Sequence, residues 1–211
     1  MIGPDLVPDD LMTAARVCRE TLTPALDRDW SVPAGDLEWD CRRTLDHMVN
    51  SLFLYAAYLA SRGSEHLSPP RNGDPSASPA QLLATVAAAA VLTEVARAAP
   101  PGTQVFYPAG MADVSGWIGM GCEEILLHTG DIAQGLGLPY RPPPDLAARV
   151  LARLFPWAPA DVDPWDSLRW AAGRAALPDR ERLGPDWYWH CPPLSEWDRT
   201  ITKRTAPPAW R

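Results

Sequence analysis

The sequence contains little that would support binding to nucleic acid. Only Lys203 is a lysine, and 19 basic residues stand against 26 acidic ones in the 211-residue chain, which gives a formal net charge of −7. Proteins that bind nucleic acid or an anionic membrane surface need clustered Lys and Arg to meet the phosphates. We therefore expect neither nucleic acid nor a membrane as a partner.

Cysteines are few, and long apolar runs are not evident. The four cysteines, Cys18, Cys41, Cys122 and Cys191, lie far apart with no CxxC pair, which favours reduced thiols over a disulfide framework. No run approaches the roughly 18 to 20 apolar residues of a membrane span. The acidic start also lacks the basic and apolar regions of a signal peptide. We expect a cytoplasmic protein with one sizeable core, as a monomer or homodimer.

What the sequence does contain is helical periodicity, interrupted by 24 prolines and 14 glycines. The spacing of apolar residues predicts helices over 8–28, 41–62, 79–98, 116–136, 143–155 and 164–176. Segments 64–79 and 99–114 predict loops, and the Trp-rich last 35 residues predict a short hairpin or an irregular cover. The expected fold is all-α, a helix bundle over 1–160 with additional C-terminal helices and the tail in 161–211 packed on it.

Glu124 and His128 form the most informative motif. They lie four residues apart in an apolar helical run, and a carboxylate there is costly unless it is paired or bound to a cation. His47 lies in the helix predicted over 41–62 and supplies a third candidate ligand. Two histidines and one carboxylate with an open position are the ligand set of a catalytic zinc site. The competing interpretation is a simple hydrogen-bonded pair on a helix face.

Asp131 and His190 are the candidate catalytic residues. Asp131 lies one helical step beyond His128, where it could accept a hydrogen bond and orient the imidazole, or remain at the surface. His190 lies between two residues of the Trp-rich tail, and a substrate contact, a core polar group and a surface residue all remain open. Asp46 is a poorer ligand than its neighbour His47, because it points about 100° away around the helix.

The surroundings of such a site are predicted only from position. The loops at 64–79 and 99–114 are expected to shape the pocket, with Trp117 or Trp189 as an apolar wall. Most arginines are expected to be solvated, although one or more could receive a carboxylate-bearing substrate. These arginines are Arg42, Arg43, Arg62, Arg169 and Arg174.

Three segments, 39–47, 124–137 and 187–198, carry a resemblance to a known family. They resemble actinobacterial DinB/YfiT-like proteins, and more narrowly the group defined by the N-terminal domain of mycothiol-dependent maleylpyruvate isomerase, over roughly 8–155. The resemblance implies a DinB-like four-helix bundle that holds a divalent metal, zinc or nickel. It implies that the ligands are a histidine of the second helix and an ExxxH pair, here His47, Glu124 and His128.

The same resemblance implies a function. The open metal position would take a low-molecular-weight thiol such as mycothiol as co-substrate, for transfer to, or isomerisation of, a small electrophile. A metal-dependent hydrolase or specialised-metabolism enzyme on the same scaffold is one alternative, and a non-catalytic metal- or small-ligand-binding bundle is another. The tail differs from the larger C-terminal domain of the isomerase, so the identity of the substrate does not carry over.

Overall fold

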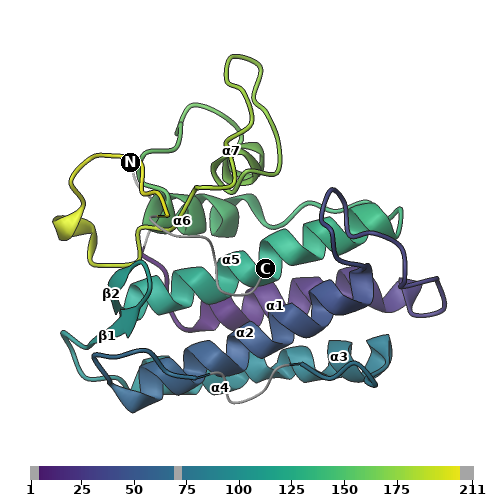
Figure 1. Ribbon diagram of the computed structural model, residues 1–211, viewed down its shortest axis with the longest axis horizontal. Coiled ribbons are helices and arrows are strands. Elements are labelled where there is room, and N and C mark those ends of the chain that lie inside the picture. The colour runs from purple at the N-terminus through teal and green to yellow at the C-terminus, as the bar shows by residue number, and fades with distance from the viewer. Residues whose placement is uncertain (1–4, 69–72, 205–211) are drawn as a thin grey trace.

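The chain forms a mostly helical structure with one small sheet (Figure 1). The computed structural model describes residues 5–68 and 73–204. Its helices and strands are, in chain order, α1 (Asp9–Leu22), η1 (Thr23–Ala25), α2 (Cys41–Ser61), α3 (Pro79–Thr85), η2 (Val86–Ala88), α4 (Ala89–Ala98), β1 (Gln104–Tyr107), β2 (Gly110–Asp113), α5 (Val114–Gly135), α6 (Pro144–Leu154), α7 (Pro164–Ala171) and η3 (Leu194–Glu196). The all-α expectation agrees with this architecture apart from the two strands.

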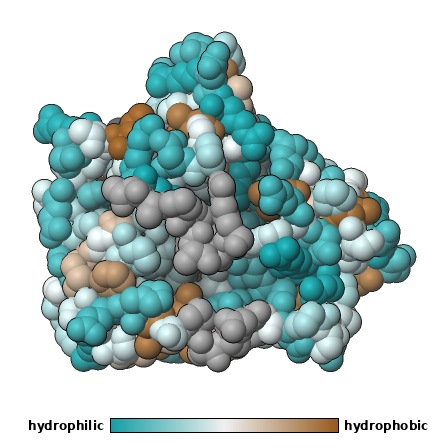
Figure 2. Space-filling model, in the orientation of Figure 1, coloured by the Kyte–Doolittle hydropathy of each residue, from teal (hydrophilic) through white to brown (hydrophobic). Residues whose placement is uncertain are grey.

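Helices α1, α2, α4 and α5 lie alongside one another and enclose the core. Both α1 and α2 pack against α4 on one side and α5 on the other. Helix α6 covers a further side of α5 and carries α7. On the face shown in Figure 2, hydrophobic residues form small patches scattered among hydrophilic ones.

Helix α5 is buried on almost every side, because α1, α2, α4 and α6 all contact it. Most of its residues are apolar or small, as such a position requires. Glu123, Glu124 and Asp131 are nevertheless buried within it, with 3%, 6% and 7% of their surface exposed. Since an unpaired buried charge is costly, these carboxylates require partners.

Two segments differ from the sequence-based expectation. The helix predicted over 79–98 is divided into α3, η2 and α4, and Ser78 caps α3 by accepting a hydrogen bond from the Gln81 backbone N–H. The loop predicted over 99–114 contains an antiparallel hairpin in which Gln104 pairs with Asp113 and Tyr107 with Gly110. Strands of four residues are too short to give a clear alternating pattern.

The Trp-rich tail is irregular and is held against the ends of α5 and α6. Arg153 of α6 is 6% exposed and donates hydrogen bonds of 3.0 Å to three successive tail carbonyls, those of His190, Cys191 and Pro192. A Cβ at Gly116 would lie 2.2 Å from the Cys191 carbonyl oxygen, so only glycine permits this approach. Within 187–204, Trp187 and Lys203 form an isolated antiparallel bridge.

One stretch, Pro79–Ala98, is long and apolar enough to cross a membrane by length and composition, with a mean hydropathy of 1.5. This corrects the expectation that no run approaches that threshold. The stretch spans the broken helix α3–η2–α4, and Leu82, Leu83 and Leu92 lie in the core. A core helix of a soluble protein passes the same test, so the stretch is weak evidence for a membrane span.

Candidate metal centre

His47 is positioned by the start of α2. Asp40 caps this helix by accepting a hydrogen bond of 2.6 Å from the Arg43 backbone N–H. His47 therefore lies in the second turn, where its ring packs edge-on against Trp39 at a centroid distance of 4.9 Å. The His47 side chain is 27% exposed, so it forms the open side of the group.

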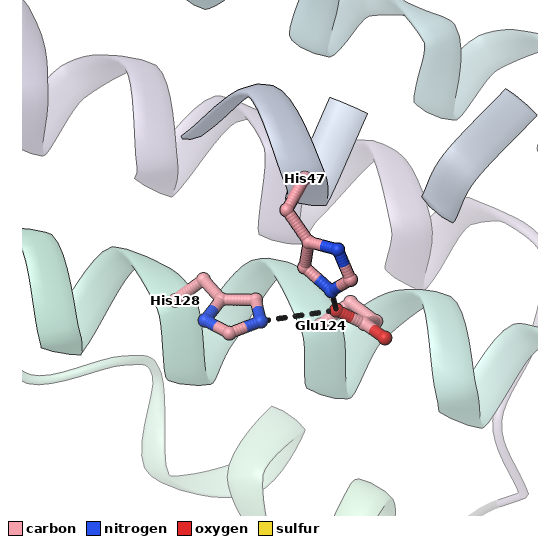
Figure 3. A group of neighbouring side chains, drawn as sticks. All are labelled: His47, Glu124 and His128. Carbon is pink, nitrogen blue, oxygen red and sulfur yellow. Dashed lines mark ion pairs between the residues drawn. The ribbon is translucent and has the colours of Figure 1, made fainter. Parts of the chain in front are cut away.

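Glu124 and His128 project from one face of α5 towards His47 (Figure 3). Residues four apart are neighbours on a helix surface, and His128 Nε2 lies 3.2 Å from Glu124 Oε2. His47 Nε2 reaches the same carboxylate oxygen from α2 at 3.5 Å. The two imidazole rings lie edge to face, with centroids 5.3 Å apart. The structure therefore brings together all three residues predicted as metal ligands.

The spacing of these atoms fits a metal ion. One ligand atom from each of the three residues lies within 4.8 Å of the other two. Bond lengths of about 2.0–2.2 Å place neighbouring ligands of a tetrahedral ion roughly 3.3 Å apart. The separations of 3.2 and 3.5 Å to Glu124 Oε2 match that value. His47, Glu124 and His128 could thus hold a metal ion.

The candidate ligands are themselves held by hydrogen bonds. Asp131 Oδ2 lies 3.1 Å from His128 Nδ1, which directs the Nε2 lone pair of His128 towards Glu124. The Tyr55 hydroxyl donates a bond of 2.8 Å to Glu124 Oε1. Partners of this kind fix the tautomer and orientation of metal ligands. The interpretation of Asp131 as the residue that orients His128 therefore agrees with the geometry.

Burial and charge act in opposite directions on these groups in the absence of a cation. Burial would raise the pKa of Glu124, but hydrogen bonds from His128 and His47 hold it well below its usual value. Burial would lower the pKa of His128, but the hydrogen bonds and charges of Asp131 and Glu124 raise it to about 9. The pKa of Asp131 is lowered against its burial, chiefly by the charge of Arg174. In the absence of a cation, a proton on His128 balances this negative charge.

Two charged residues of the site were missed by the sequence-based prediction. Arg174 is not solvated as expected: its side chain is 18% exposed and Nη2 donates to Asp131 Oδ2 at 3.3 Å. Glu123 is buried beside the ligands, and its Oε1 has no hydrogen-bond partner among the described residues. Burial and the charge of Glu124 raise the pKa of Glu123 to about 8. The sequence signal that could have identified Glu123 is its position as a second carboxylate in the same apolar run as Glu124.

The ligands lie in a cavity of about 550 Å³. Six further residues that line it are aromatic or cationic: Trp39, Trp187, Trp189, Arg43, Arg174 and Arg204. Trp189 is thus one of its walls, as predicted, whereas Trp117 is fully buried in the core. The loops 64–79 and 99–114 contribute none of the described lining residues. The segment before α2 and the tail form these walls instead.

His190 is not brought to this cavity. It is 6% exposed, and its Nε2 lies 3.2 Å from the Pro193 carbonyl oxygen within the tail. Its backbone N–H donates to the Leu154 carbonyl at 2.9 Å. His190 therefore lies with the segment that fastens the tail to α6, and it is not among the described residues that line the cavity.

Comparisons with known proteins give no relative: no family model, no curated protein and no solved structure matches the chain.

Proposed function

We propose that the chain is a DinB-type four-helix bundle, formed by α1, α2, α4 and α5, that binds a divalent cation and acts as a thiol-dependent transferase or isomerase. Zinc is the first candidate and nickel the second. The co-substrate is a low-molecular-weight thiol such as mycothiol, and the substrate is a small electrophile. One observation carries the proposal: two histidines and one carboxylate from α2 and α5 converge in a cavity large enough for a small molecule.

A divalent cation with an open position lowers the pKa of a bound thiol or water, so that a nucleophile exists at neutral pH. The side chains present supply the rest of the site. Asp131 orients His128, and Trp39, Trp187 and Trp189 offer apolar walls that exclude water. Arg43, whose guanidinium lies 4.6 Å above the Trp39 ring, can contact an acidic group of a substrate.

Glu123 favours a second function on the same scaffold, that of a metal-dependent hydrolase. Its carboxylate lines the metal cavity, is buried, and leaves Oε1 without a partner among the described residues. With a cation bound beside it, Glu123 would lose the proton that it holds in the metal-free protein, and its carboxylate could then accept a proton from an attacking water. The hydrolase therefore needs Glu123 and no thiol, whereas the transferase or isomerase needs the thiol.

The metal is tested by elemental analysis of the purified protein and of two histidine variants. We expect about one zinc or nickel per chain, lost in His128→Ala. His66→Ala is the matched control, because His66 is exposed and its Nδ1 contacts the Tyr58 hydroxyl at 2.8 Å. Stoichiometric metal that persists in His128→Ala would contradict this ligand set.

The reaction class is tested with the metal-loaded protein, mycothiol and the electrophile monochlorobimane. The thiol-dependent proposal predicts fluorescent conjugate at a rate above that of the His128→Ala variant. Hydrolysis of ester or amide probes without thiol, abolished in Glu123→Gln, would favour the hydrolase. A loaded protein inert in both assays would support a non-catalytic metal- or ligand-binding role.

A further inference from the structure

A second, smaller cavity lies next to the cavity that contains the candidate metal ligands. Arg174 lines both cavities. The smaller cavity has a volume of about 220 Å³. Its described lining residues come from α5, from α7 and from the segments that follow these helices, and they include Asp131, Trp165 and Arg169. Nothing in the proposed thiol chemistry uses this space.

Both guanidinium groups that line this cavity have donors without an acceptor in the described part of the chain. Arg169 is half-buried, and its guanidinium has no hydrogen-bond acceptor or ion-pair partner among residues 5–68 and 73–204. The Nε of Arg174 is buried and has no acceptor in the same described part of the chain. Asp131 is the acidic residue of the described lining, so two guanidinium groups face one carboxylate. The carboxylates of Glu123 and Glu124 also act on Arg174 from outside this lining, so what the cavity lacks is an acceptor for Arg174 Nε and for the Arg169 guanidinium.

We propose that this cavity binds a small carboxylate, which accepts hydrogen bonds from Arg169 and Arg174. The guanidinium group presents paired N–H donors that match the two oxygens of a carboxylate. A carboxylate ligand would supply the acceptor that the Arg169 guanidinium lacks. Asp131 remains the partner of Arg174 Nη2 and the Ala172 carbonyl that of Nη1, so Nε is the Arg174 donor left for the ligand.

The other residues that line the cavity favour a ligand whose carboxylate is attached to an apolar group. Trp165 is 7% exposed and packs edge-on against Tyr140, with ring centroids 5.5 Å apart. A Cβ at Gly130 of α5 would lie 2.9 Å from Trp165 Cζ2, so glycine is required for the indole to pack this closely. The volume is below the roughly 300–1,000 Å³ of sites for drug-sized ligands. A monocarboxylate with one ring or a short chain, such as benzoate, fits these walls.

This site is linked to the metal centre through one side chain. Asp131 Oδ2 contacts both His128 and Arg174, and Arg174 lines both cavities. The proposal does not depend on which metal or thiol the larger cavity takes, because its donors are arginine side chains.

The test is calorimetric titration of the full chain with sodium benzoate at constant ionic strength in chloride. We expect one saturable site, and Arg169→Gln should weaken it about tenfold or more, as loss of a charged hydrogen bond would. Arg169→Lys keeps the positive charge but loses the paired N–H donors of the guanidinium group, so it should weaken benzoate binding less. Arg141→Gln is the matched control, because Arg141 is exposed and pairs with Asp163 and Asp166.

The Arg43→Gln variant locates the bound carboxylate. Arg43 lines only the metal cavity, so benzoate affinity should not change in this variant. Loss of binding in Arg43→Gln but not in the Arg169 variants would place benzoate at the metal centre and overturn the proposal. Absence of saturable binding, or tighter binding of phosphate than of benzoate, would overturn it as well. Circular dichroism checks that each variant is folded. If Arg169→Gln does not fold, the benzoate affinity of Arg169→Lys serves as the test.

Discussion

Asp131 lies between His128 and Arg174, and its Oδ2 contacts His128 Nδ1 at 3.1 Å and Arg174 Nη2 at 3.3 Å. One carboxylate oxygen therefore orients a candidate metal ligand and neutralises a largely buried guanidinium. Because the Asp131 side chain is 8% exposed, water can do little to replace either contact. The arrangement makes Asp131 the residue on which the geometry of the site most depends after the ligands.

Replacing Asp131 by asparagine should lower zinc affinity about 10- to 100-fold, the usual cost of losing a partner that orients a ligand histidine. Competition titration against a chromophoric chelator measures this affinity. Asp36→Asn is the control, because Asp36 is exposed and pairs only with Arg182 among the described residues. An unchanged zinc affinity in Asp131→Asn would remove Asp131 from the site.

Zinc affinity should rise with pH. In the metal-free protein the pKa of His128 is raised to about 9, so below that pH a cation must displace a proton. We expect up to about a tenfold gain in apparent affinity per pH unit from this proton between pH 7 and 9, and a plateau above. Titrations at three pH values in this range test the slope.

The same shift affects the stability of the metal-free protein. A folded-state pKa above the ordinary value stabilises the fold fully below pH 6.5, and this contribution is lost as the pH rises through about 9. The Glu123→Gln variant is the control for both measurements, because Glu123 also holds a proton up to about pH 8. A pH-independent zinc affinity in Glu123→Gln would contradict the role given to His128.

The four cysteines should not react with Ellman's reagent at pH 8 in the native protein. All four are fully buried, and burial raises the pKa of Cys18, Cys41 and Cys191 to about 12. Denaturation in guanidinium chloride should release four thiols, as expected for reduced cysteines. Because no cysteine is among the candidate ligands, chelation of the metal should leave the native result unchanged. Rapid reaction of one thiol before unfolding would contradict this burial.

Replacing Arg153 by methionine should lower the free energy of unfolding by about 3 kcal/mol, because a buried ion pair loses one partner. Arg153 donates to Asp113 Oδ1 at 2.6 Å as well as to the tail carbonyls. Urea unfolding measures the loss. In the control Arg97→Gln, an exposed arginine loses Asp9 and Glu94, and the change should stay below about 1 kcal/mol. Equal effects of the two substitutions would mean that the tail contributes little to stability.

The sequence predicted the positions of the helices better than it predicted how the helices pack against one another. The periodicity of apolar residues placed the main helices within a few residues, because this signal is local. Spacing alone also put Glu124 and His128 on one face. It could not place His47 opposite them, because helix pairing depends on the whole core, and only the family resemblance indicated that convergence.

The residues that were missed are those whose role depends on tertiary burial. Arg174 reads as a surface charge in sequence, yet the fold places it against Asp131. The contribution of Trp39 and Trp187 to the cavity likewise depends on where the tail and the segment before α2 come to lie. Neither feature leaves a periodic signal in a single sequence.

The hydrogen bond from Tyr55 to Glu124 has a consequence for coordination number. Tyr55 occupies Oε1, while both histidines face Oε2, so Glu124 would bind a cation through one oxygen only. A tetrahedral ion held by these three residues would then have one position left for an exchangeable ligand. If a cation binds here, the hydroxyl of this buried tyrosine would keep one of its positions open to small molecules, because it prevents the carboxylate from closing that position.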